Sequence, residues 1–163
     1  MSLHIYTDGS CRGNGKQDAV GAWGFVAIDK NEQEIWSDHG VTVGTTNQRM
    51  EMKAVYYACV WATIHTDNEN IYIYTDSAYI HNCLTQKWYE NWENNGWLNS
   101  KKEPVANKDL WIDLLPFCKD VRFNFTKVPG HQNGKTTHSY WNNYIDRIVQ
   151  NTTADVINGN PKK

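Results

Sequence analysis

Two identical tripeptides, Tyr6-Thr7-Asp8 and Tyr74-Thr75-Asp76, each place an aspartate directly after an apolar segment of strand-like sequence. Turn or helix-cap residues follow each aspartate at once. Ligand sites of open α/β sheets form at the carboxyl ends of strands. If the two strands are parallel neighbours, Asp8 and Asp76 face each other and repel unless one is protonated or a divalent cation binds both. An N-cap for the following helix is the alternative interpretation of Asp76 taken alone.

Two further acids, Glu51 and Asp146, complete a candidate cluster. Glu51 lies on the apolar stripe of a predicted helix, where an acid is costly unless it is paired or metal-bound. An ion pair with Arg49 is the alternative for Glu51, and a solvated helix position is the alternative for Asp146. Taken together, the four carboxylates form an oxygen-only ligand set. Such a set suits Mg²⁺ or Mn²⁺ and the two-metal cleavage of a phosphodiester bond.

The elements that must position these acids follow from hydrophobic periodicity and turn signals. Three strands joined by hairpins are predicted at residues 3–8, 21–28 and 34–43. Helices are predicted at residues 47–66, 77–86 and 108–119 and in a last helix toward Ile157, with strands at residues 70–75 and 121–128. The Trp-rich stretch before residue 108 is predicted to be irregular. Two rows form the buried stripe of the first helix: Met50, Ala54, Tyr57, Trp61 and Ile64, and beside them Glu51, Val55, Ala58 and Ala62.

The order of these elements predicts an α/β fold. An antiparallel meander followed by strand-helix-strand alternation gives a mixed sheet of five strands, three antiparallel and then two parallel, with helices on both faces. The length of 163 residues suits one domain with a sizeable core, predicted for residues 1–157. Residues 158–163 are predicted to be a disordered tail.

Composition argues against several classes of protein. With a formal net charge of −2, any attraction for phosphate must be local or metal-borne. The four cysteines, Cys11, Cys59, Cys83 and Cys118, lie far apart, which indicates reduced thiols and neither a zinc module nor a disulfide framework. The sequence holds no run of about 18 apolar residues and no basic, then apolar N-terminal segment. A cytoplasmic protein without a membrane partner is therefore expected.

Four motifs resemble those of type 1 ribonuclease H in order and approximate spacing. They are Tyr6-Thr7-Asp8-Gly9-Ser10-Cys11, Thr46-Asn47-Gln48-Arg49-Met50-Glu51, Tyr74-Thr75-Asp76-Ser77 and Val128-Pro129-Gly130-His131. Residues 88–97 and 104–111 are similar to the substrate-binding handle of bacterial members, so the resemblance extends to Asp146. It implies the ribonuclease H-like fold and a stand-alone, monomeric endoribonuclease with no obligate protein partner. Such an enzyme hydrolyses the RNA strand of RNA/DNA hybrids and leaves 5′-phosphate and 3′-hydroxyl ends.

The resemblance also implies roles for individual residues. The four acids match those that hold two Mg²⁺ ions, which Mn²⁺ can replace, around the scissile phosphate. His131 matches a histidine that relays protons or aids product release. Because the stretch from His131 to Asp146 is longer than the family usually shows, His138 is the rival candidate for that role.

Substrate recognition is implied for a further set of residues. Residues that contact the 2′-hydroxyls and the deoxy strand in the family match Cys11, Asn14, Asn47 and Gln48. Thr46 and Asn107 match members of the phosphate pocket on the DNA side, and Trp88 matches the residue of the deoxyribose groove. The chain departs from the family where Gly44 replaces a common arginine and Ala78 a longer polar side chain. In the handle, Glu93-Asn94-Asn95 replaces a basic run and leaves the phosphate contacts to Lys101, Lys102 and Lys108. A weaker or altered grip with a shallower salt dependence is therefore expected.

Two other interpretations compete with the ribonuclease. A nucleic-acid-binding module that has lost catalysis would lose its acids first, and none of the four is missing. A DEDD-type exonuclease or an integrase-like strand transferase places its acids in other local contexts. It also lacks the Asn47-Gln48-Arg49-Met50-Glu51 element together with the handle. The sequence therefore favours the ribonuclease.

Overall fold

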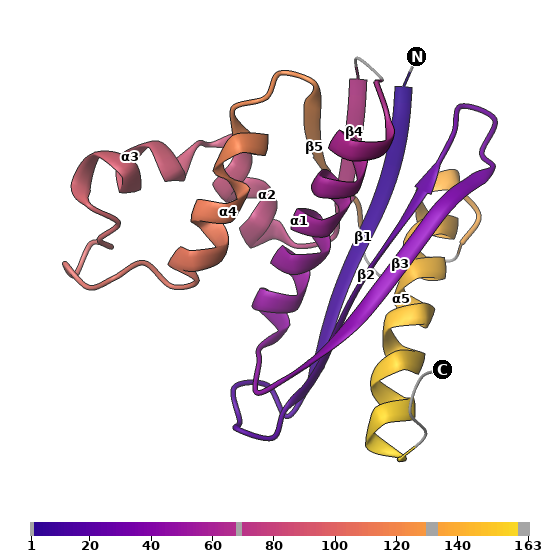
Figure 1. Ribbon diagram of the computed structural model, residues 1–163, viewed down its shortest axis with the longest axis horizontal. Helices are drawn as coiled ribbons and strands as arrows, with labels where there is room; N and C mark the ends of the chain where they lie inside the picture. The colour runs from indigo at the N-terminus through magenta and orange to yellow at the C-terminus, as the bar shows by residue number, and fades with distance from the viewer. Residues whose placement is uncertain (1, 68–69, 130–133, 160–163) are drawn as a thin grey trace.

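The structure is a computed structural model and describes residues 2–67, 70–129 and 134–159. Its centre is a five-stranded sheet with the strand order β3-β2-β1-β4-β5 (Figure 1). The strands are β1 (Ser2–Arg12), β2 (Val20–Ile28), β3 (Glu34–Val43), β4 (Asn70–Thr75) and β5 (Phe123–Lys127). β1, β2 and β3 are antiparallel, whereas β4 is parallel to β1 and β5 is parallel to β4. The predicted mixed sheet is confirmed.

Two long helices cover the two faces of this sheet. α1 (Asn47–His65) lies on one face and α5 (Thr137–Ile157) on the other (Figure 1). Three shorter helices lie on the α1 side: α2 (Ala78–Thr85), α3 (Trp88–Asn95) and α4 (Lys108–Cys118). α4 contacts α1, α2 contacts β4 and β5, and α3 projects outward from the body of the fold. Of the tail predicted for residues 158–163, residues 160–163 lie outside the described residues, so the tail remains a prediction.

The stretch predicted to be irregular contains the helix α3. It is eight residues long, and its N-cap residue Lys87 adopts a left-handed conformation with φ of 58°. Trp88 and Trp92, one turn apart, place their rings against Tyr79 and Trp111 respectively. A polar helix of two turns is marginal by its own propensity, so the sequence pattern gave little sign of it. Packing of these aromatic rings stabilises it instead.

The buried face of α1 differs in part from the predicted stripe. The buried residues are Met50, Met52, Ala54, Val55, Ala58, Cys59 and Ala62. Tyr57 and Ile64 are exposed, Ile64 by 70%. At about 100° per residue, the predicted row that begins with Met50 lies at one edge of the buried arc, and Tyr57 and Ile64 fall just outside it. The arc is centred near the second predicted row and continues beyond it to Met52 and Cys59.

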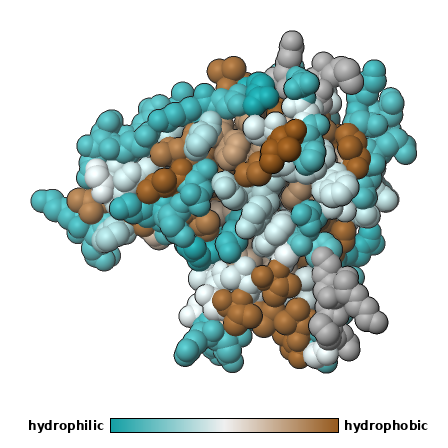
Figure 2. Space-filling view, in the orientation of Figure 1, coloured by the Kyte–Doolittle hydropathy of each residue, from teal (hydrophilic) through white to brown (hydrophobic). Residues whose placement is uncertain are grey.

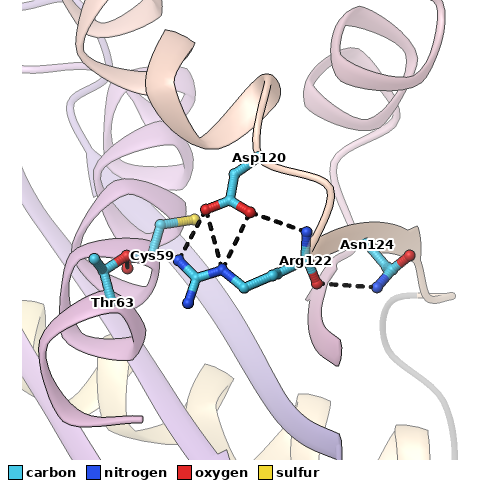
Figure 3. Close-up of polar contacts among 5 residues, drawn as sticks. All are labelled: Cys59, Thr63, Asp120, Arg122 and Asn124. Carbon is cyan, nitrogen blue, oxygen red and sulfur yellow. Dashed lines mark hydrogen bonds and ion pairs between the residues drawn. The ribbon is translucent and has the colours of Figure 1, made fainter. Parts of the chain in front are cut away.

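The cysteines are free thiols, as predicted. Cys59 is buried in α1, and its side chain points toward the Asp120 carboxylate in the turn before β5 (Figure 3). The Arg122 guanidinium donates to both oxygens of Asp120 over 2.8 to 3.2 Å and holds this turn. Burial, with smaller effects of Cys118 and Asp120, raises the pKa of the Cys59 thiol well above its ordinary value. Cys59 is therefore a protonated, unreactive core residue.

Apolar side chains on the outer surface form separate patches among hydrophilic ones (Figure 2). The exposed apolar residues of β3 and α1 include Ile35, Trp36, Val41, Val43 and Ile64. On β3, an edge strand of the sheet, the Asp38 carboxylate accepts a hydrogen bond from the backbone N–H of His39 at 2.8 Å. That donor is therefore occupied and is not offered to another strand. In the described part of the chain, no helix has the length and apolarity needed to span a membrane.

Candidate metal centre

The two twin aspartates lie side by side because their strands are parallel and in register. Tyr6 pairs with Tyr74 at the last pair of the β1–β4 ladder, so Asp8 and Asp76 both lie two residues beyond it. The first strand does not end at residue 8 as predicted. It continues to Arg12 as the partner of β2, which pairs Asp8 with Gly24. Hydrogen bonding to β2 extends the strand, and Asp8 marks only the end of its pairing with β4.

Glu51 reaches this point from α1 because Gly9 has no side chain. A Cβ atom on Gly9 would lie 2.7 Å from the carbonyl oxygen of Met50 and even closer to the backbone nitrogen of Glu51. Real Cβ atoms do not approach backbone this closely, so only glycine allows the first turn of α1 to sit against β1. The backbone N–H of Gly9 then donates to Oε1 of Glu51 at 3.0 Å, which fixes the orientation of that carboxylate.

Asp8, Glu51 and Asp76 form a tight carboxylate cluster. One oxygen from each side chain lies within 4.8 Å of the others. Asp8 is 4% exposed, and within the described residues its Oδ2 and the Oε2 of Glu51 are buried without a hydrogen-bond partner. Burial, the charge of Glu51 and hydrogen bonding with Asp146 raise the pKa of Asp8 well above its ordinary range. Burial and the charge of Asp76 raise the pKa of Glu51 to about 8.

Asp146 approaches the cluster from the opposite face of the sheet. It lies on α5, and the hydrogen bond that raises the pKa of Asp8 brings its carboxylate next to that residue. All four acids line one open cavity of about 400 Å³. Asp146 is not one of the three residues whose oxygens lie within 4.8 Å of one another. The structure thus brings the four acids together, with Asp146 at the margin of the other three.

The simpler interpretations of Asp76 and Glu51 do not match the geometry. Ser77, not Asp76, caps α2, because its Oγ accepts from the backbone N–H of Ile80 at 3.2 Å. Arg49 pairs with Asp109 at 2.8 Å and not with Glu51. Buried carboxylate oxygens that lack donors, in a set without nitrogen or sulfur ligands, fit a hard divalent cation. A cation here would supply the positive charge that the cluster lacks.

Comparison with known proteins identifies the family. The ribonuclease H family profile matches residues 1–155. The chain belongs to the ribonuclease H family. It is 43% identical over 148 residues to a ribonuclease H of Syntrophomonas wolfei, which covers 90% of this chain and 92% of the relative. It is 37% identical over 155 residues to a ribonuclease H of Clostridium botulinum strain Hall, with coverage of 94% and 96%. This member of the family is therefore a nuclease.

Solved structures share the fold at lower identity. The solution structure of the foamy virus (PFV) ribonuclease H domain has a TM-score of 0.78 at 22% identity, covering 93% of this chain and 94% of that one. LC11-RNase H1 in complex with an RNA/DNA hybrid has a TM-score of 0.68 at 19% identity, covering 95% and 99%. These likenesses concern the architecture of the ribonuclease H fold.

Polar residues that the sequence suggested for substrate recognition lie at the start of α1 and around the cavity. Cys11 and Asn47 line the cavity with the acids. Asn14 accepts from the backbone N–H of Asn47 at 2.6 Å, which joins the loop after β1 to α1. Gln48 accepts from the side-chain amide of Asn107 at 3.0 Å, which joins α1 to α4. These two hydrogen bonds place side-chain amide groups of this ribonuclease H along one edge of the site.

The other residues suggested for substrate contact have structural roles or lie outside the cavity of the acids. Thr46 is the N-cap of α1 and accepts from the backbone N–H of Arg49 at 3.1 Å. Trp88 is on α3, outside the residues that line the cavity, and its indole donates to Gln86 at 3.1 Å. Gly44 adopts φ of 71° in the turn before α1, a conformation that favours glycine, so this turn disfavours the arginine common in the family. Ala78, exposed, begins α2.

Of the two candidate histidines, the structure describes His138. His131 lies outside the described residues. His138 begins α5, where its Nδ1 is hydrogen-bonded to the Tyr6 hydroxyl and its ring lies 4.7 Å from that of Tyr74. His138 is not among the residues that line the cavity of the acids. The structure therefore gives the rival candidate a place in an aromatic cluster beside the site.

Sequence reasoning did not assign Ser10 and Gln150 to the cavity that they line, and it gave Ser77, which lines it too, only the role of a turn or cap residue. Ser10 follows Asp8 by two residues on the strand, and Gln150 follows Asp146 by four residues on the helix. These are the spacings of one strand face and one helix face. The same spacings were the available signal, but they carry weight only once the two acids are known to meet.

Proposed function

We propose that this ribonuclease H cleaves the RNA strand of RNA/DNA hybrids endonucleolytically and leaves 5′-phosphate and 3′-hydroxyl ends. The observation that carries the proposal is the cluster of Asp8, Glu51 and Asp76, with oxygens within 4.8 Å and two of them buried without a donor. A structural relative, LC11-RNase H1, is described in complex with such a hybrid. The acids and the fold together support this substrate and a metal-dependent reaction.

We assign the catalytic acids as Asp8, Glu51 and Asp76, with Asp146 as the fourth. Two Mg²⁺ ions, or Mn²⁺, when bound would neutralise phosphate charge and make water nucleophilic at neutral pH. Asp8 is buried between Glu51 and Asp146 and is therefore the acid best placed to bind both ions. Glu51 is held in orientation by the N–H of Gly9. For products with 5′-phosphate and 3′-hydroxyl ends, the oxygen of water would form a bond to phosphorus, the bond between phosphorus and the 3′-oxygen would break, and that oxygen would leave as the 3′-hydroxyl. The four acids would hold the ions in a fixed position beside the scissile phosphate.

Substrate recognition follows the edge of the cavity. We assign Cys11, Asn47 and Gln48 to the RNA strand, because the first two line the cavity and the third is adjacent at the start of α1. We also assign Asn14 to substrate binding, next to Asn47, whose backbone N–H donates to its side chain. We assign Thr46 and Asn107 to a phosphate of the DNA strand and Trp88 to its sugars. We also infer His131 as the histidine of the reaction, since His138 is committed to Tyr6.

The four free thiols support a reducing compartment, and we infer a cytoplasmic monomer formed by one domain of residues 1–157. Size-exclusion chromatography with light scattering tests the monomer directly. A stable dimer would contradict it.

The experiment that tests the substrate offers the protein four labelled duplexes in Mg²⁺: RNA/DNA hybrid labelled on either strand, duplex RNA and duplex DNA. We expect loss of the RNA strand of the hybrid alone, with products that a polynucleotide ligase or kinase assay shows to have 5′-phosphate ends. Cleavage of duplex DNA, or equal cleavage of duplex RNA, would contradict the proposal. The Asp8→Asn variant prepared in parallel excludes a contaminating nuclease, because it removes one acid and keeps the shape of the side chain.

A further inference from the structure

We infer that Ser10 and Gln150 form a positioning pair that fixes α5 against β1 and thereby places the Asp146 carboxylate beside Asp8. The inference rests on the proposed function, because it concerns the fourth acid of the proposed metal centre. Gln150 donates through Nε2 to Oγ of Ser10 at 3.0 Å. Both residues line the same cavity as the acids.

Ser10 and Gln150 meet one step farther along β1 and α5 than Asp8 and Asp146 do. Ser10 is two residues beyond Asp8, a rise of about 6.6 Å along a strand, and its side chain shares a face with Asp8. Gln150 is four residues beyond Asp146, a rise of about 6 Å along a helix, again on the same face. Because the two steps nearly match, a hydrogen bond between Ser10 and Gln150 sets the separation of the acids that precede them.

Contacts on either side of Asp146 fix α5 to the sheet. The apolar side chains on either side, Ile145 and Val149, pack over Gly24 of β2 and so hold the helix to the neighbouring strand. About two turns before Asp146, His138 contacts Tyr6. Asp146 thus lies between two points at which α5 is bonded to β1.

A direct contact of Gln150 with substrate is the competing role, and the two roles predict different kinetics. A positioning residue acts through Asp146, so its loss weakens metal binding in the absence of nucleic acid and lowers kcat. A substrate contact leaves metal binding of the free protein unchanged and raises KM. Measurement of metal binding without nucleic acid therefore separates them.

The test compares wild type with Gln150→Leu, Ser10→Ala and the double variant by titration calorimetry of the free protein with Mn²⁺. The matched control is Asn151→Ala, an exposed neighbour on α5. Loss of groups that orient metal ligands typically weakens metal affinity about 10- to 100-fold. We expect about a 10-fold loss for each single variant, because the pair positions the helix that carries Asp146 and does not bond to the Asp146 carboxylate itself. The double variant should be no weaker than either single variant, since both remove the same bond. Ser10→Thr, which keeps the hydroxyl, should restore most of the affinity, and KM for the hybrid should stay within about twofold.

Unchanged Mn²⁺ affinity in both single variants would overturn the inference, as would additive losses in the double variant or a raised KM with unchanged metal binding. If Gln150→Leu fails to fold, Ser10→Ala and its comparison with Ser10→Thr decide the matter. A wild-type protein that binds no Mn²⁺ would instead overturn the proposed function, and this inference with it. Wild type that binds Mn²⁺ normally while the variants equal it would overturn the positioning pair alone.

Discussion

The close approach of α1 to β1 at Gly9 makes a demanding prediction for Gly9→Ala. The added methyl group would lie 2.7 Å from the carbonyl oxygen of Met50, and closer still to the next backbone nitrogen. Carbon atoms pack favourably at about 3.5–4.0 Å. The first turn of α1 must therefore move away by about 1 Å, and Glu51 moves with it. The neighbour is backbone, so no side-chain rotation relieves the overlap.

Two effects of different size follow from this shift. Overpacking of this kind costs about 1–3 kcal/mol of the free energy of unfolding. For a domain of this size, that corresponds to a fall in Tm of about 2–12 °C. The cleavage rate should fall more sharply, about 100-fold, because a displacement of about 1 Å in a catalytic group can cost that much. The expected signature is a folded protein with little activity.

The assay measures thermal unfolding, Mn²⁺ affinity and cleavage of an RNA/DNA hybrid for Gly9→Ala and for Gly40→Ala as the matched control. Gly40 is also a strand glycine, but its added methyl group would meet ring atoms of Trp23 at 2.7 Å, and a side chain can shift. Gly40→Ala should lose some stability and keep its metal affinity and rate. If Gly9→Ala keeps wild-type affinity and rate, the close approach does not position Glu51 and the reasoning is wrong.

Three further predictions test the charges and caps around the site. Asp8→Asn should raise the free energy of unfolding of the metal-free protein by about 1–3 kcal/mol, since carboxylates within 4.8 Å repel. Because burial and the charge of Asp76 raise the pKa of Glu51 to about 8, wild type in EDTA should lose stability as pH rises from about 4.5 through 8. Asp8→Asn removes a second carboxyl whose pKa is raised, that of Asp8 itself, so urea unfolding should show a smaller loss over this range in the variant. Thr46→Ala removes the cap that accepts from Arg49 and should cost about 0.5–2 kcal/mol, measured by urea unfolding, with Thr46→Ser as the control that retains it. Lys101→Ala should reduce the slope of log affinity against log salt for the hybrid by about one unit, and an unchanged slope would remove this lysine from the phosphate contacts.

The sequence predicted those parts of the fold whose signals are local. Strand-like segments and turn residues gave the meander, and the strand-helix-strand order gave the parallel strands. The condition under which Asp8 and Asp76 would face each other, parallel neighbouring strands, is met by the pairing of Tyr6 with Tyr74. The sequence did not predict α3, because a polar helix of two turns depends on distant rings such as that of Trp111. The length of β1 was also missed, since its last residues continue only as partners of β2.

In the candidate site, too, local sequence signals predicted the acids but not the contacts that bring them together. Asp8, Asp76 and Glu51 could be proposed as a cluster when their positions were taken together, because an acid at a strand end or on an apolar helix face needs a partner or a bound cation. Their meeting depends on Gly9, whose importance appears only when α1 and β1 are placed together. Gln150 has no signal of its own, because its partner Ser10 is 140 residues away in sequence.

The most direct test of a metal-dependent, four-acid centre is the initial rate of RNA-strand cleavage in a hybrid, measured from EDTA to excess Mg²⁺ for wild type and Asp8→Asn. Wild type should be inactive in EDTA and should reach a plateau as Mg²⁺ rises. Asp8→Asn should stay folded and lose activity by orders of magnitude at every concentration. Cleavage by wild type in EDTA, or a wild-type rate in Asp8→Asn, would contradict the account.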